Sequence, residues 1–93
     1  MGFEWDPVKN ATNEAKHGIS FEEAADVFDD PDHVIEASTR SEHGETRFLA
    51  VGQVGAYLTS VIFTYRHGNQ RIISARRAKR NERGKYRQGP ASS

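Results

Sequence analysis

Residues 71–87 read RIISARRAKRNERGKYR and join a β-branched run to a strongly basic segment. The apolar start of this stretch is typical of a buried strand. From Arg76 to Arg87, seven of the twelve residues are Arg or Lys. Guanidinium groups bond phosphate oxygens through parallel N–H donors and keep their charge at any physiological pH. The junction therefore predicts a nucleic acid as the first partner to test.

The charge of the chain is separated along its length. Residues 1–45 hold 3 Lys and Arg against 12 Asp and Glu, a formal charge of −9. Residues 46–93 hold 10 against 1, a formal charge of +9, so the whole chain sums to zero. The basic half can hold an anionic substrate while the acidic half meets a basic partner. The alternative is that the two halves only fold against each other.

Length and composition exclude several classes of protein. A chain of 93 residues predicts one small domain, residues 1–88, followed by a flexible tail, residues 89–93. The absence of Cys excludes disulfides and thiolate metal sites, and four scattered His form no ligand signature. We therefore expect no metal and no cofactor. The sequence shows no signal peptide or membrane span, so we expect a cytoplasmic protein with no membrane partner.

Two helices are predicted ahead of the main strands. The first should cover residues 7–17, because Asp6 is a favoured N-cap followed by Pro, and Gly18 readily closes a helix. Ser20–Glu23 is a capping box. The apolar side chains after it recur at helical spacing, which predicts a second helix as far as Phe28.

The remainder of the chain is mostly strand-like, with a basic helix near the end. Predicted strands cover residues 3–6, 33–38, 47–52, 57–65 and 71–75. Residues 39–44 and 66–70 are predicted turns, and the strand around Ile62 is apolar on both faces, as expected for a central strand. A helix over residues 78–87 is weakened by Gly84. This order predicts an α+β fold, with N-terminal helices on one face of a twisted, mainly antiparallel sheet and a C-terminal basic helix.

An imidazole, a carboxylate and a guanidinium occur together near the start of the predicted strand over residues 47–52, and these are the groups that a metal-free ribonuclease uses. Residues 43, 45 and 47 share a face if the strand begins by His43. Glu45 or His43 would take a proton from a ribose 2′-hydroxyl, and Arg47 with Arg76 would hold the pentavalent phosphorane. The alternative is a Glu–Arg ion pair on the surface of the sheet.

Other polar residues also have a structural alternative. Lys16 and His17 suit the last turn of a helix, where the dipole favours cations, although a histidine can exchange protons near neutral pH and a lysine can meet a phosphate. Arg76, Arg80, Arg83 and Arg87 recur near one helical face, which would line a phosphate groove or be a solvated surface, with Glu82 paired locally. Three aromatic residues would stack bases or pack in the core: Trp5, Tyr65 and Tyr86.

Taken together, these motifs resemble the BrnT toxin family from Phe3 to about Tyr86. The stretches that carry the resemblance are FEWDP (3–7), Asn13, KHG (16–18), SFEEA (20–24), VF (27–28), DP (30–31), ETRF (45–48), RIISARRA (71–78), ER (82–83) and Tyr86. The resemblance implies a ribonuclease toxin of a type II toxin–antitoxin pair with a RelE-like fold. It also implies a BrnA-type antitoxin with a ribbon-helix-helix domain, which alone would contact DNA.

The resemblance extends to the candidate site. It implies functional roles for Lys16, His17, Glu45, Arg47, Arg76, Arg80 and Arg83, with Glu45, Arg47, Arg76 and His17 catalytic and the others binding RNA. His43 lies where the match is poor and gains no support. Two alternatives stay open beside a metal-independent endoribonuclease that inhibits translation and growth. One is a non-catalytic module that binds nucleic acid or the antitoxin, and the other is a protein that serves only in partner assembly.

Overall fold

The computed structural model describes residues 2–42 and 45–89, and only the backbone of residues 39–42. The elements are β1 (Phe3–Glu4), α1 (Pro7–His17), α2 (Phe21–Ala24), the 3-10 helix η1 (Ala25–Asp29), β2 (Val34–Glu42), β3 (Glu45–Val54), β4 (Tyr57–Arg66), β5 (Asn69–Arg77) and α3 (Arg80–Gln88). The candidate His43 and the end of the predicted tail lie outside the described residues. None of the described helices has the length and apolar character needed to cross a membrane.

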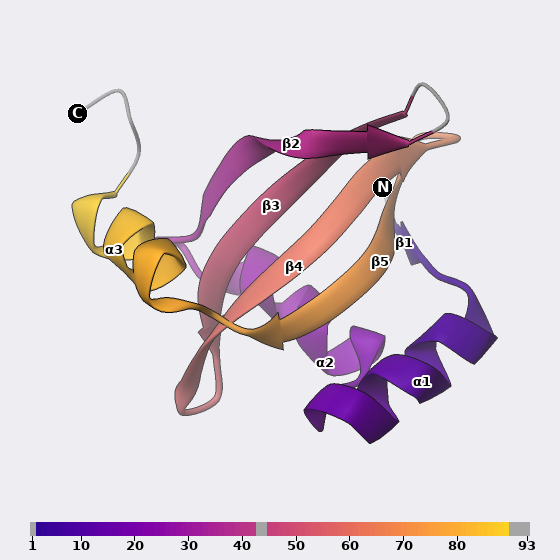
Figure 1. The fold of residues 1–93 in the computed structure, drawn as a ribbon, viewed down its shortest axis with the longest axis horizontal. Helices are drawn as coiled ribbons and strands as arrows, with labels where there is room; N and C mark the ends of the chain where they lie inside the picture. Colours follow the sequence, from indigo (N-terminus) through magenta and orange to yellow (C-terminus); the bar gives the residue numbers. More distant parts are fainter. Residues whose placement is uncertain (1, 43–44, 90–93) are drawn as a thin grey trace.

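The strands form one mixed sheet in the order β1-β5-β4-β3-β2 (Figure 1). Neighbours pair antiparallel except β1 and β5, which run parallel. β4 occupies the middle of the sheet, as its two apolar faces predicted. The prediction of an α+β fold is confirmed.

Local signals fix the start of the chain as predicted. The Asp6 carboxylate accepts a hydrogen bond from the Val8 N–H at 2.8 Å, and Gly18 ends α1 with a φ of 73°. The capping box is present, because the Ser20 hydroxyl accepts from the Glu23 N–H and the Glu23 carboxylate accepts from the Ser20 N–H. The predicted bounds of α1 are confirmed.

The second helix differs from its prediction. Its α-helical part ends at Ala24, and the chain continues as η1 to Asp29. The Asp30 N–H bonds the Val27 carbonyl at 3.2 Å, a tighter closure than an α-helix makes. Asp30 precedes a proline, which disfavours helical conformation at that residue. A continuous α-helix to Phe28 was therefore wrong.

Four of the five strands run further than the sequence predicted, whereas the predicted strand over residues 3–6 is only β1 (Phe3–Glu4), because Asp6 already caps α1. β2 continues to Glu42 and pairs with β3, which replaces most of the predicted turn over residues 39–44. The β4–β5 connection is only His67 and Gly68, both with positive φ, as a two-residue hairpin turn requires. Pairing with neighbouring strands extends these elements beyond what their local sequence indicates.

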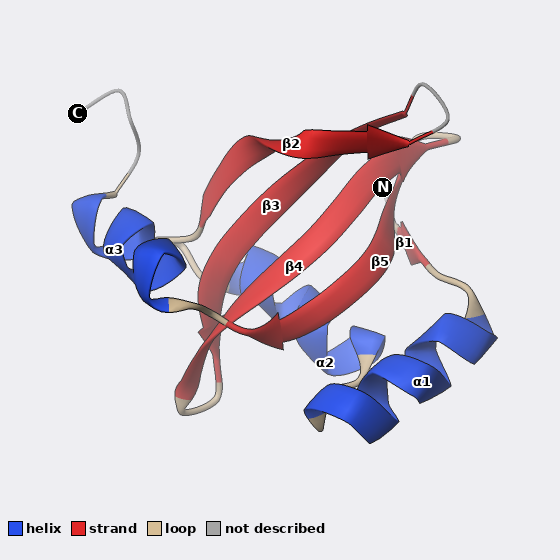
Figure 2. Cartoon of the chain, in the orientation of Figure 1, coloured by secondary structure: helices blue, strands red, loops and turns tan. Residues whose placement is uncertain are grey.

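The sheet has two unlike faces (Figure 2). The helical face is covered by α1, α2 and η1, and its core contains the fully buried Phe21, Val27, Phe63 and Ile72. A Cβ atom at Gly52 would lie 2.8 Å from a backbone oxygen of η1, so only glycine permits this close approach. The opposite face, which we call the open face, carries α3 at one end. There the second apolar cluster forms around Leu49, Val51 and Ala78, with Ile62 and Tyr86 packed against it.

Candidate functional site

A groove crosses the open face beside α3. Its volume is about 560 Å³, and we call it the open-face groove. Its apolar lining is Leu49, Ile62 and Ile73 together with Ala37. Its charged lining is Arg47, Arg76, Lys79, Lys85, Glu36 and Glu82. The four cations exceed the two carboxylates, which makes the groove suited to an anionic ligand.

Arg76 and Glu82 form the strongest polar contact in the groove. The two Arg76 nitrogens Nη1 and Nη2 donate to the two carboxylate oxygens of Glu82 at 2.7 and 2.9 Å. The Ser60 hydroxyl and the Lys79 N–H each donate to Glu82 Oε1 at 2.8 Å. Glu82 is only 5% exposed, so these donors replace the water that burial removes. The pair locks the first turn of α3 to the end of β5.

This contact controls the ionisation of both partners. Burial alone would raise the pKa of Glu82, but the hydrogen bonds from Arg76, the Lys79 N–H and Ser60 outweigh it and lower the pKa to about 2. The hydrogen bond to Glu82 raises the pKa of Arg76. Glu82 therefore stays ionised at neutral pH and is a weak base.

The second carboxylate of the groove is also paired. Lys85 donates to the Glu36 carboxylate, which joins α3 to β2. A third polar contact of α3 is made by Tyr86, whose hydroxyl donates to Asp30 Oδ2 at 2.7 Å. That hydrogen bond raises the pKa of Tyr86 to about 12. Polar contacts therefore hold α3 to β2, to β5 and to the end of η1.

Glu45 lies at the other end of the open face. It shares a strand face with Arg47, as the alternation of β3 predicted. Its ion pair is with Arg66 of β4, whose Nη2 lies 2.6 Å from Glu45 Oε1. The hydrogen bond from Arg66 lowers the pKa of Glu45, despite a smaller opposing effect of burial. The structure thus brings Arg47 and Arg76 into one groove, whereas Glu45 does not line that groove.

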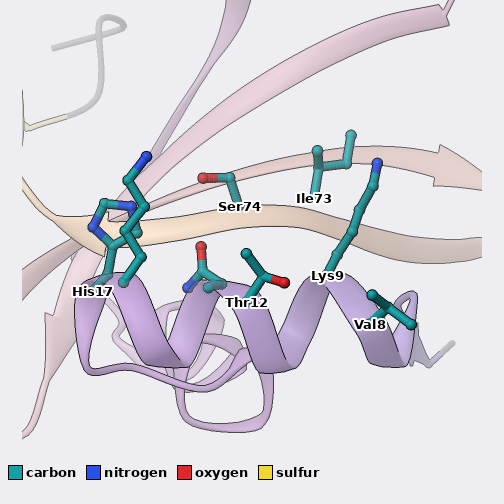
Figure 3. Close-up of a pocket in the computed structure, with 8 residues that line it drawn as sticks. Val8, Lys9, Thr12, His17, Ile73 and Ser74 are labelled. Carbon is teal, nitrogen blue, oxygen red and sulfur yellow. The ribbon is translucent and has the colours of Figure 1, made fainter.

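His17 and Lys16 line a second hollow between α1 and β5, with a volume of about 270 Å³ (Figure 3). We call it the edge hollow. It is lined also by Val8, Lys9, Thr12 and Asn13. Ile73 and Ser74 of β5 line both this hollow and the open-face groove. The two predicted α1 residues and the two groove arginines therefore lie on adjoining surfaces, on either side of β5.

Arg80 and Arg83 do not line either hollow. Arg80 is exposed, and Arg83 Nη1 donates to the Ala78 carbonyl at 2.8 Å. The prediction that Arg76 shares a helical face with Arg80, Arg83 and Arg87 was wrong. Arg76 belongs to β5, because α3 begins only at Arg80.

Sequence reasoning missed three lysines at these sites: Lys9, Lys79 and Lys85. A spacing of three residues through Glu82 places Lys79 and Lys85 on one side of α3, so the sequence held a usable signal for these two. The place of Lys9 depends on how α1 packs against β5, for which no local motif exists.

The aromatic candidates lie outside the groove. Trp5 packs edge-on against Phe21 with ring centres 6.3 Å apart, and Tyr86 is bonded to Asp30. Tyr65 is 51% exposed but packs against Phe63 on the helical face. The described geometry therefore favours packing roles for these aromatic side chains.

A comparison with known families gives a match that covers most of the chain. Among the described residues, no three His, Asp or Glu side chains are grouped closely enough to hold a metal ion. No curated protein matches the chain. Residues 5–82 match a family described as "Ribonuclease toxin, BrnT, of type II toxin-antitoxin system". The matched range is most of the chain and contains the whole open-face groove except Lys85. The chain therefore belongs to the BrnT family of ribonuclease toxins of type II toxin–antitoxin systems.

Proposed function

We propose that this chain is a metal-independent endoribonuclease with a RelE-like fold, which cleaves RNA in the cytoplasm and thereby inhibits translation and growth. The observation that carries the proposal is the convergence of Arg47 from β3 and Arg76 from β5 in one groove where cations exceed carboxylates. Two guanidinium groups that line one groove, on strands separated by β4, suit a phosphate that gains negative charge during cleavage.

The proposed reaction uses the ribose 2′-hydroxyl of the substrate. A general base takes the proton of the 2′-hydroxyl as its oxygen attacks phosphorus, and a general acid protonates the 5′ oxygen as its bond to phosphorus breaks. The products carry a 2′,3′-cyclic phosphate and a 5′-hydroxyl. Arg47 and Arg76 would stabilise the pentavalent phosphorane. His17 is the better candidate for proton transfer, because Glu45 is held by Arg66 with a lowered pKa that weakens it as a base.

The surrounding cations would guide the RNA strand. Lys16 borders the edge hollow, and Arg80 and Arg83 extend the positive charge of α3 beyond the groove. The ligand chemistry of the groove supports a reaction without a metal ion. Its two carboxylates, Glu36 and Glu82, are already bonded to Lys85 and Arg76, so binding a divalent ion would require breaking these ion pairs.

A type II toxin has an antitoxin partner, and we propose a BrnA-type protein with a ribbon-helix-helix domain. DNA would then be contacted only through the complex. The helical face supports a protein contact, because Phe3, Ile35 and Tyr65 are each at least 40% exposed there. Phe3 and Tyr65 both pair in register with Gln70, so they lie at the same level of the sheet, on the two strands that flank β5.

Incubation of RNA with the purified chain and EDTA tests the proposal. The wild type should cleave RNA and leave 2′,3′-cyclic phosphate ends. Arg47→Ala should lower the cleavage rate by about 100-fold, the usual cost of removing one donor to a transition-state oxyanion. Arg87→Ala is the matched control, since Arg87 is exposed and lines neither hollow, and it should retain nearly full activity.

Folding of each variant is checked by urea unfolding. A folded wild type that leaves RNA intact, with and without ribosomes, would contradict the proposal. Salt-dependent RNA binding without cleavage would instead identify a non-catalytic binding module. Cleavage that stops in EDTA and returns with added Mg²⁺ would overturn metal independence alone.

A further inference from the structure

We propose that the edge hollow is a subsite for one nucleotide of single-stranded RNA that flanks the cleaved bond, with Lys9 as a binding residue for its phosphate. This inference rests on the proposed ribonuclease function. It adds a part of the substrate, beyond the scissile phosphate, that the chain would recognise.

A β-bulge brings the edge hollow and the open-face groove together. In the β4–β5 pairing, Ile62 is opposite Ser74 and Phe63 is opposite Ile72, so Ile73 is an extra residue in β5. Bulges redirect side chains and are common next to active sites. Ile73 and its neighbour Ser74 line both hollows. An RNA strand that leaves the open-face groove across this bulge therefore enters the edge hollow directly.

The edge of β5 is accessible at this point because β1 covers only part of it. β1 pairs with Gln70 and Arg71, and on this side of β5 no described strand continues alongside Ile73 and the residues after it. Asn13 of α1 fills part of this edge: its amide accepts from the Ala75 N–H at 3.2 Å and donates to the Ala75 carbonyl at 2.9 Å. These two buried bonds fix α1 against β5, so the hollow between them is formed before any ligand binds.

The lining of the edge hollow matches the two parts of a nucleotide. Its apolar wall includes Val8, which is 73% exposed, and Ile73. Its volume of about 270 Å³ is close to the lower limit of pockets for drug-sized ligands, about 300 Å³, and so suits one base or sugar. Figure 3 shows Lys9 and His17 rising from α1 toward β5 at the two ends of the hollow, with Thr12 between them. The apolar wall suits the base, and the ammonium groups of Lys9 and Lys16 suit the phosphate.

The cations of the edge hollow are available for a ligand. Within the described residues, neither Lys9 nor Lys16 takes part in an ion pair. This contrasts with Arg76 and Lys85 in the groove, which are both bonded to carboxylates. A phosphate would thus gain contacts with Lys9 and Lys16 without breaking an internal bond.

The test measures binding of uncleavable RNA fragments in which the nucleotides carry 2′-O-methyl groups. One fragment has only the two nucleotides around the scissile phosphate, and the others add one nucleotide on the 5′ or the 3′ side. We expect one of the longer fragments to bind the wild type about tenfold more tightly than the dinucleotide. Lys9→Gln should abolish this gain, leave dinucleotide binding unchanged and reduce the salt slope of the longer fragment by about one.

Lys9→Arg should restore the gain, and Arg87→Gln, outside both hollows, should leave it unchanged. The inference is overturned if neither longer fragment binds more tightly, or if Lys9→Gln weakens all fragments equally. Because this readout needs no cleavage, it is separate from a failure of the proposed function. If the wild type binds these fragments but never cuts natural RNA, only the ribonuclease proposal fails.

Discussion

Two Glu–Arg pairs lie at opposite ends of the open face, and they differ in burial and in the number of hydrogen bonds that join the partners. Glu82 and Arg76 are joined by two parallel hydrogen bonds, and Glu82 is 5% exposed. Glu45 and Arg66 share one contact at 2.6 Å, and their side chains are 26% and 42% exposed. Exposed pairs contribute little to stability because water and salt screen them, whereas a buried carboxylate depends on its partners.

The comparison separates scaffold from candidate chemistry. The Glu82–Arg76 pair receives further donors from Ser60 and the Lys79 backbone, so it joins three segments of the chain. Arg76 therefore holds α3 against β5, in addition to any contact with RNA. A loss of activity in Arg76→Ala could arise from a displaced α3, and that substitution alone cannot assign Arg76 a catalytic role.

The largest expected effect is that of Glu82→Ala. The change leaves the Arg76 guanidinium and the buried Ser60 hydroxyl without their acceptor, which should reduce the free energy of unfolding by about 3 kcal/mol in urea titrations at pH 7. Glu45→Ala is the matched control and should shift the unfolding midpoint only slightly. Equal effects of the two substitutions would show that the two pairs do not differ in the way that their burial indicates.

The pH dependence of stability should come next in size. The pKa of Glu82 is about 2 in the folded chain and lies near 4.5 when the group is unperturbed. A carboxyl group with a lowered folded pKa stabilises the fold above its unfolded pKa, and this stabilisation is lost as the pH falls through the folded pKa. The wild type should therefore lose stability between about pH 5 and pH 2.

Glu82→Gln isolates this contribution, because Asp30 and Glu45 also have lowered pKa values and destabilise the wild type in acid. The difference in unfolding free energy between wild type and Glu82→Gln should be constant above pH 5 and should shrink below it. Thermal or urea unfolding at several pH values measures the difference. A difference independent of pH down to pH 2 would be incompatible with the lowered pKa.

The smallest expected effect on stability is that of Glu45→Gln, and its effect on RNA cleavage is the informative quantity. If the pair with Arg66 is only a surface contact, cleavage and stability should both stay close to those of the wild type. We expect this result, since the lowered pKa makes Glu45 a weak base. A loss of about 100-fold in cleavage rate, with unchanged unfolding, would instead assign proton transfer to Glu45.

Local motifs allowed the start of the chain to be predicted, whereas sheet pairing decided the rest. Asp6, Gly18 and the Ser20 capping box act within one turn of helix, so the sequence shows them directly. The bulge at Ile73 and the full length of β2 depend on neighbouring strands, which no local pattern reveals.

The candidate site divides in the same way. Arg47 and Arg76 were expected together because two guanidinium groups suit one phosphate. The alternation of β3 predicted the face of Arg47, whereas the predicted strand ended at Ala75 and left Arg76 outside it. The burial of Glu82 was not expected, although its pairing was, because the depth of a side chain depends on how α3 docks on the sheet. Lys9 was missed because its position follows from the contact of α1 with β5.

The amide of Asn13 has a consequence for how molecules of this chain meet one another. A sheet edge with unpaired backbone groups invites a strand from another molecule to pair with it, which leads to aggregation. Asn13 occupies both hydrogen-bonding groups of Ala75 from within the same chain, at a separation of 62 residues. An incoming strand would have to displace this side chain first. A single amide thus helps to keep β5 closed to foreign strands where β1 no longer covers it.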